Sequence, residues 1–217
     1  MSNEYGYVGA EVAQSFKNNR GIFSPQDILE LDQANKWTNF GQLELIETIT
    51  ASSATQIDFL NLNDKFGATY NYHYLTGSNI SVSLDSGRIT GRFFESGVLN
   101  SSSDYEFAFK QTNSNVSSSD TKSTSDNKLK IGTTQGNSAV TDLGAFQGWF
   151  ANLNASHLYS YYNGTTIGLS GGVIRTDVGG SFLDQASFIT GIRLFAHHSS
   201  SITMNGVFSL YGLRTFS

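Results

Sequence analysis

Histidines are the residues of this sequence best suited to metal or acid–base chemistry, and their spacing does not assemble a site. They stand at His73, His157, His197 and His198, with no His-x-His or His-Glu-x-x-His pattern. The adjacent pair would point to opposite sides of a strand, so its two rings could not share one ion. The oxygen-bearing residues of segment 58–64 could hold calcium, but they lack the spacing of a calcium loop and fit a polar turn. We therefore expect neither a metal nor a cofactor.

Paired carboxylates would allow a different chemistry, because glycosidases need two of them flanking a sugar. Asp104 and Glu106 are two residues apart, so on a strand they would share a face at a separation of roughly 7 Å. Such a pair is also common on any solvated strand face. The sequence has no cysteine, no Gly-x-Ser-x-Gly segment and no phosphate-binding loop. We predict no catalytic residues and a chain that is not an enzyme.

Aromatic side chains are the better candidates for binding. Tyr159, Tyr161 and Tyr162 precede an Asn-Gly pair, and Trp149 lies among other aromatics in segment 146–150. Tyrosine and tryptophan present a flat apolar face with a polar group, which suits contacts with carbohydrate and protein. The alternative is that these rings fill the core, and for Trp149 we expect the core. The three tyrosines are the candidate contacts for a glycan or a host surface.

The elements that must position these side chains are β-strands, which begin near Gly41. In segment 69–75 tyrosines alternate with polar residues, and segments 80–84 and 105–109 alternate as cleanly. Further strand candidates are the segments 43–50, 146–153, 187–196 and 207–213. Roughly ten closely spaced strands without intervening helices predict an antiparallel β-sandwich of jelly-roll type.

Turn signals divide these strands. The pairs Asn163-Gly164 and Asn205-Gly206 lie between strand-like flanks and predict two-residue hairpins of type I′, because both residues tolerate positive φ. Segment 111–128 holds one apolar residue, Val116, among serine, threonine, asparagine and aspartate. It predicts a long loop that is mobile or projects outward.

The first 40 residues differ from the rest. Ser24 can cap a helix and Pro25 fits its first position, where no amide hydrogen is needed. We predict a short helix from Pro25 to about Lys36, on an attachment arm of residues 1–40 that precedes a sandwich domain of residues 41–217. A helix of about three turns is marginal alone, so the arm must dock on this domain or on another subunit. The residues expected to dock it are Phe23, Ile28, Leu31 and Trp37.

Composition restricts the class of protein. The chain has 217 residues, a net charge of −5, 14% charged residues and 13% aromatic residues. This charge argues against a nucleic-acid-binding surface, which would show a basic patch. The sequence contains no run of 18 apolar residues, so it predicts no membrane span. The first ten residues do not resemble a secretory signal. Without cysteine, the chain suits folding in a reducing cytoplasm.

Two parts of the sequence resemble proteins of tailed-bacteriophage particles. Segment 201–213, SITMNGVFSLYGL, resembles the final hairpin of β-sandwich domains in many phage virion proteins. Segment 18–37 is similar to an N-terminal element in structural proteins of marine phages, and segment 43–59 fits the opening of their sandwich domains. None of these segments is catalytic in that family, so the resemblance transfers no active-site residue.

The resemblance implies a structural protein on the surface of a phage particle, assembled in the host cytoplasm. We expect it in the tail fibre or adsorption apparatus, with a capsid decoration or head knob protein as the alternative. The expected partners are other virion proteins, bound through the arm, further copies in a homotrimer or other homo-oligomer, and a host surface glycan. We expect no nucleic-acid partner and no membrane insertion. An alternative from another class is a free carbohydrate-binding module.

Overall fold

The fold of the described residues is all-β and built from antiparallel sheets. The computed structural model describes residues 25–26, 29, 43–63, 70–137 and 141–213. The chain divides into two compact units, Met1–Phe40 and Gly41–Ser217, and all thirteen described strands belong to the second. No helix within the described ranges is long and apolar enough to cross a bilayer.

Three residues of the predicted N-terminal helix are described. Pro25, Gln26 and Leu29 are α-helical. The rest of segment 25–36 lies outside the described residues, so the helix as a whole stays a prediction. Also outside them are the four expected docking residues, Phe23, Ile28, Leu31 and Trp37.

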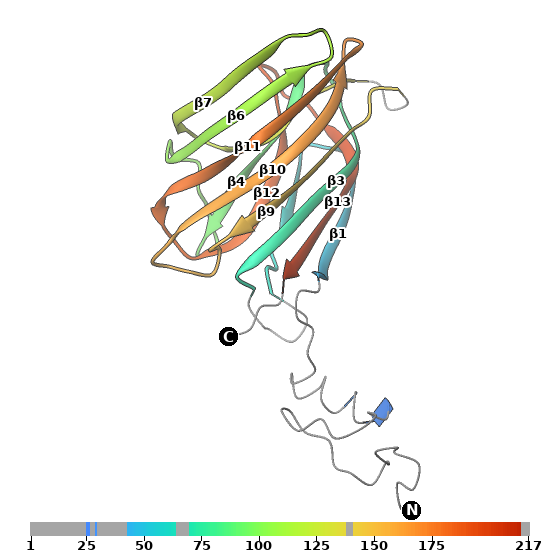
Figure 1. Ribbon diagram of the computed structural model, residues 1–217. Helices are drawn as coiled ribbons and strands as arrows, with labels where there is room; N and C mark the ends of the chain where they lie inside the picture. Colours follow the sequence, from blue (N-terminus) through green and yellow to red (C-terminus); the bar gives the residue numbers. More distant parts are fainter. Residues whose placement is uncertain (1–24, 27–28, 30–42, 64–69, 138–140, 214–217) are drawn as a thin grey trace, which may run out of the picture. The chain divides into compact units, whose positions relative to one another are not determined.

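The larger sheet has eight strands in the order β1-β13-β3-β9-β10-β11-β6-β7, which Figure 1 shows as one layer. All of its strand pairs are antiparallel. Its strands are β1 (Leu43–Ala54), β3 (Tyr72–Val82), β6 (Tyr105–Asn113), β7 (Ser118–Asp126), β9 (Gly144–Ala151), β10 (Tyr159–Ser170), β11 (Val173–Ala186) and β13 (Met204–Leu213).

The second sheet lies behind the first in Figure 1, and its strands follow the order β2-β12-β4-β5, with β8 also paired to β4. Its strands are β2 (Gln56–Phe59), β4 (Gly87–Glu95), β5 (Val98–Leu99), β8 (Leu129–Gln135) and β12 (Ile189–His197). The two sheets enclose one core, as in a β-sandwich. Its largest fully buried side chains include Tyr105, Tyr162, Phe93, Phe150 and Phe208.

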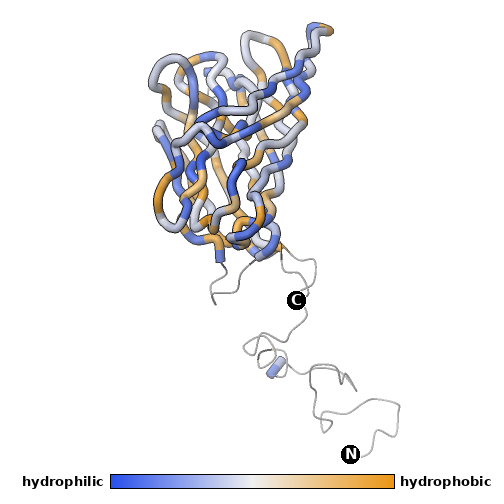
Figure 2. The backbone as a smooth tube through the Cα atoms, turned by 90° about the vertical axis from the view of Figure 1, so that its left-hand side faces the viewer, coloured by the Kyte–Doolittle hydropathy of each residue, from blue (hydrophilic) through white to orange (hydrophobic). Residues whose placement is uncertain are grey.

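Alternation along the strands produces this core, as the sequence predicts. In β10 the buried residues Ser160, Tyr162 and Gly164 alternate with the exposed residues Tyr161 and Asn163. Figure 2 shows hydrophilic and hydrophobic residues closely interspersed along the chain. Since successive side chains of a strand point to opposite faces, inner strands of the larger sheet such as β10 and β13 have one buried and one outward side.

The predicted hairpin at Asn163-Gly164 is wrong, because both residues lie in the middle of β10. Glycine is needed there for space and not for a turn. A Cβ at Gly164 would lie 2.1 Å from the Tyr162 hydroxyl oxygen, and one at Gly148, its partner on β9, would lie 2.3 Å from the Tyr162 ring. The two glycines therefore form a slot that the buried tyrosine ring occupies.

The predicted hairpin at Asn205-Gly206 is also wrong, because both residues belong to β13. Gly206 has a φ of 147°, and the pairing of β13 with β3 shifts register between Asn205 and Val207. The conformational freedom of glycine, which predicted a turn, here serves a strand residue opposite a β-bulge, and the extra residue of that bulge lies on β3. Asn205 accepts a hydrogen bond from the backbone N–H of Ser53 at 2.8 Å.

The predicted loop at 111–128 is wrong as well. Its first residues end β6, and a tight turn then leads into β7, the edge strand of the larger sheet. Backbone hydrogen bonds to β6 hold β7 in place, and most of its polar side chains point into solvent. A strand at an edge needs no apolar face, so its composition resembled that of a loop.

The Tyr162 slot yields a prediction about stability. We expect Gly148→Ala to lower the free energy of unfolding by about 1–3 kcal/mol, because the added methyl group overpacks the ring. The matched control is Gly132→Ala, whose Cβ would meet its nearest neighbour at an ordinary 3.5 Å. Urea denaturation should show a loss only for Gly148→Ala. Equal effects of the two substitutions would contradict the slot.

Candidate functional site

The outward face of the larger sheet carries a row of three aromatic side chains. Tyr211 on β13 is paired with Tyr74 on β3, and Tyr74 is paired with Trp149 on β9. These strands lie side by side in Figure 1. The three side chains therefore lie at one level, which means that they are paired across three neighbouring strands. The aromatic row, as it is called below, consists of Tyr211, Tyr74 and Trp149.

The rings of the aromatic row contact one another. The ring centroids of Tyr74 and Trp149 are 4.7 Å apart, and those of Tyr74 and Tyr211 are 6.2 Å apart. The Tyr74 hydroxyl donates a hydrogen bond to Oε1 of Gln147 at 2.7 Å, which holds the ring from the polar side. Trp149 is 38% exposed and is the most open of the three. The expectation that Trp149 belongs to the core is therefore wrong.

Small side chains continue this level of the sheet beyond Trp149. Trp149 is paired with Asn163 on β10, Asn163 with Gly180 on β11, and Gly180 with Ala108 on β6. The surface thus drops from three large rings to residues with short side chains. A shallow hollow of about 380 Å³ lies beside Trp149 and is lined by Leu43, Tyr74, Gln147, Gly148, Trp149, Asn163, Gly164 and Thr165.

The three tyrosines proposed from the sequence separate by face. Tyr159 and Tyr161 are 51% and 42% exposed on the outward side of β10. Tyr159 stacks on Phe182 of β11, with ring planes 12° apart. Tyr162 points inward and is 1% exposed, and this burial raises the pKa of its hydroxyl. Tyr162 therefore does not reach a ligand on this face, whereas Tyr159 and Tyr161 do face solvent.

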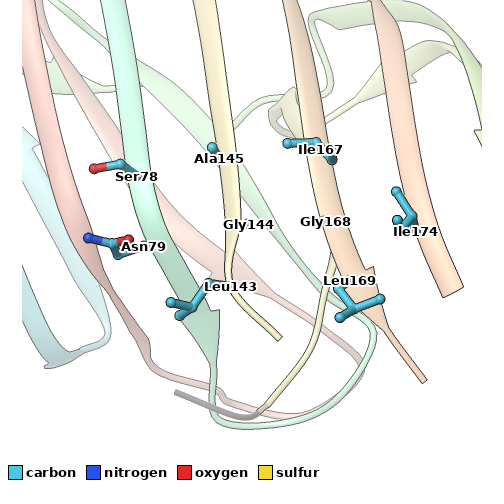
Figure 3. A pocket seen from close by; sticks show the side chains of 9 residues that line it. All are labelled: Ser78, Asn79, Leu143, Gly144, Ala145, Ile167, Gly168, Leu169 and Ile174. Atoms are coloured by element: carbon cyan, nitrogen blue, oxygen red, sulfur yellow. The ribbon is translucent and has the colours of Figure 1, made fainter. Parts of the chain in front are cut away.

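A second hollow, of about 420 Å³, lies on the same sheet near the start of β9. Figure 3 shows the aliphatic side chains of Ile167, Leu169 and Ile174 on the neighbouring strands β10 and β11. On the other side β3 shifts register against β9 between Gly77 and Ile80. Its lining is mostly aliphatic, so it suits apolar contact better than polar recognition.

A buried ion pair joins the two sheets. Nζ of Lys130 on β8 is 2.7 Å from Oδ2 of Asp177 on β11, with the two side chains 5% and 0% exposed. Nε2 of Gln111 donates hydrogen bonds to Oδ1 of Asp177 at 2.9 Å and to the Thr133 hydroxyl at 3.0 Å. Burial lowers the pKa of Lys130, and the bond to Asp177 opposes that shift. Solvent does not reach the pair. Its role is therefore to hold β8 in its packed position.

The histidines do not come together with other ligands. His73 is fully buried and donates its Nε2–H to the carbonyl of Leu62 at 2.7 Å, and burial lowers its pKa. Among the residues with described positions, no three histidine, aspartate or glutamate side chains gather where they could hold a metal ion. Glu106 lies on β6 opposite Phe182 of β11, and Asp104 precedes that strand.

The aromatic row and the polar hollow beside it are the described surface that is best equipped for recognition. No protein-family model, curated protein or solved structure matches this chain. The geometry of the outward face is therefore what bears on function. The alternation of tyrosines in segment 69–75 was a signal for Tyr74, but the pairing of Tyr74 with Trp149 and Tyr211 depends on strand register, which no local pattern shows.

The buried ion pair yields a second prediction about stability. Asp177→Ala leaves the Lys130 ammonium buried without its counter-charge, so we expect a loss of about 3–5 kcal/mol in the free energy of unfolding. The double variant Lys130→Met/Asp177→Leu removes both charges and should recover most of that loss. Guanidinium denaturation of the three proteins measures both effects.

The control for this prediction is the exposed pair of Lys110 and Asp120, whose charged atoms are 3.1 Å apart at the edge of the sheet. Asp120→Ala should cost less than about 1 kcal/mol, because water screens that pair. A double variant as unstable as Asp177→Ala would show that the pair itself, and not an uncompensated charge, supports the fold.

Proposed function

We propose that this chain is a non-enzymatic structural protein on the surface of a tailed-bacteriophage particle, in the tail fibre or adsorption apparatus, with a sandwich of jelly-roll type. The observation that carries the binding part of this proposal is the outward face of the larger sheet. One side of that sheet packs in the core, while its other side leaves aromatic and aliphatic side chains exposed without any covering strand or helix of the described residues.

The character of this face supports contact with another molecule. Exposed apolar side chains occur on several neighbouring strands, including Trp149, Tyr161, Ile167, Ile174 and Val178. Grouped apolar residues on a surface mark interaction sites more often than single ones do. The edge strand β7 is polar and charged, which discourages pairing between sheet edges. Contact through the face is therefore favoured over contact through this edge.

The assignment to a phage particle rests on the sequence resemblance in segments 18–37, 43–59 and 201–213. In this proposal residues 1–40 attach the protein to other virion proteins, and the sandwich faces outward. The protein forms a homotrimer or another homo-oligomer, binds no nucleic acid and does not enter a membrane. Low charge and the lack of cysteine are compatible with assembly in the host cytoplasm.

The number of copies in a purified particle tests where the protein belongs. A tail-fibre or adsorption protein should be present in about a dozen copies or fewer, since each particle carries few such fibres. Quantitative mass spectrometry against the major capsid protein measures this number. Hundreds of copies would instead support the alternative, a capsid decoration or head knob protein, and absence from the particle would reject both.

Removal of the arm tests the proposed attachment. We expect a chain without residues 1–39 to remain a folded, soluble sandwich but to lose oligomerisation and binding to its virion partners. Circular dichroism and analytical ultracentrifugation compare it with the full chain. If the sandwich unfolds, the arm is part of its core, and the attachment role loses its support.

A free carbohydrate-binding module is the second candidate function. The aromatic row favours it, because exposed tryptophan and tyrosine rings are suited to carbohydrate contact. A module of this kind would bind polysaccharide without belonging to any particle, so detection of the protein in purified virions decides between the two.

A further inference from the structure

We propose that the outward face of the larger sheet binds a neutral oligosaccharide, with Trp149 as the stacking platform and Asn163, Gln147 and Thr165 as its polar contacts. This inference adds a ligand and a site to the proposed function. It does not depend on the phage assignment, because it rests only on residues of the described sandwich.

The stacking platform is held in place before any ligand arrives. Trp149 packs against the Tyr74 ring on one side, and Tyr74 is held by its hydrogen bond to Gln147. Trp149 still exposes 38% of its surface. The C–H-rich face of a pyranose ring can cover such a surface, and little side-chain freedom is lost because the ring is already packed.

Polar groups lie where the hydroxyls of a stacked sugar would need partners. The hollow beside Trp149 includes Asn163, Thr165 and Gln147, which come from β10 and β9. An amide side chain offers both donors and an acceptor, and a hydroxyl offers both as well. The mixture of a flat apolar ring with neutral donors and acceptors matches a sugar better than a purely apolar ligand. The aliphatic hollow of Figure 3 lacks this mixture.

Charge selects a neutral ligand over an acidic one. The paired residues from Tyr211 to Ala108 carry no charge, and the first cation at this level is Lys122 on the edge strand β7. Lys110 lies on the neighbouring level and is already paired with Asp120. Among the described residues at this level, a uronic or sialic acid carboxylate beside Trp149 would therefore find no basic partner.

The shape of the face also suggests how a longer chain would lie. Beyond Asn163 the same level continues through Gly180 and Ala108, whose small side chains leave space above the sheet. Neighbouring strands are about 4.8 Å apart, which is close to the advance of one sugar along an extended glycan. An oligosaccharide crossing the strands would thus place successive sugars over β9, β10 and β11.

The test uses the full chain and an array of neutral and acidic oligosaccharides, followed by titration calorimetry with the best neutral compound. We expect neutral compounds to bind, Trp149→Ala to weaken binding at least tenfold, and Asn163→Ala to weaken it several-fold. Phe188→Ala is the matched control, because Phe188 is an exposed aromatic residue in the connection between β11 and β12. Its affinity should equal that of the unchanged protein.

Several outcomes would overturn the proposal. One is that no neutral compound binds, and another is that only acidic compounds bind. A third is that both Trp149→Ala and Asn163→Ala bind the neutral compound with undiminished affinity. Thermal denaturation checks that each variant is folded. If Trp149→Ala does not fold, the affinity of Asn163→Ala decides whether the site binds the glycan. If Trp149→Ala instead converts an oligomer to a monomer in sedimentation, the face belongs to a second copy of this chain and the glycan site is rejected.

Discussion

The fit of the Tyr162 ring between Gly148 and Gly164 is the constraint on which the rest of the larger sheet depends. The two glycines are direct partners on β9 and β10, and a Cβ on either would collide with the ring. A shift of one residue between these strands would place a side chain in the slot and would exchange the two faces. The core thus holds the register of its central strands.

The same register produces the outward surface. Trp149 follows Gly148 and Asn163 precedes Gly164, and the two are themselves paired, so the packing below the sheet decides which residues meet above it. The row of Tyr211, Tyr74 and Trp149 needs three correct strand pairings. A buried tyrosine and an exposed tryptophan are in this way linked through backbone pairing, although they lie on opposite sides of the sheet.

A second constraint lies deeper, where β8 is buried along its whole length. A strand covered on both faces is ordinarily apolar, yet β8 carries Lys130 and Thr133. Asp177 neutralises the lysine, and Gln111 connects the aspartate to Thr133. β8 is therefore held against the larger sheet by an ion pair and hydrogen bonds as well as by apolar contacts.

Local periodicity determined the all-β class and the alternation of strands such as β3, because successive side chains of a strand point to opposite faces. It did not distinguish a turn from a bulge or a slot, since the Asn-Gly pairs at 163–164 and 205–206 serve close approach and a bulge within strands. Nor did composition reveal β7, because an edge strand is held by backbone hydrogen bonds that any sequence can make. The place of Trp149 on the surface was decided by tertiary structure alone. Residues 62 or more positions apart in the chain, Tyr211, Tyr74 and Trp149, become neighbours only when strand pairing brings them together.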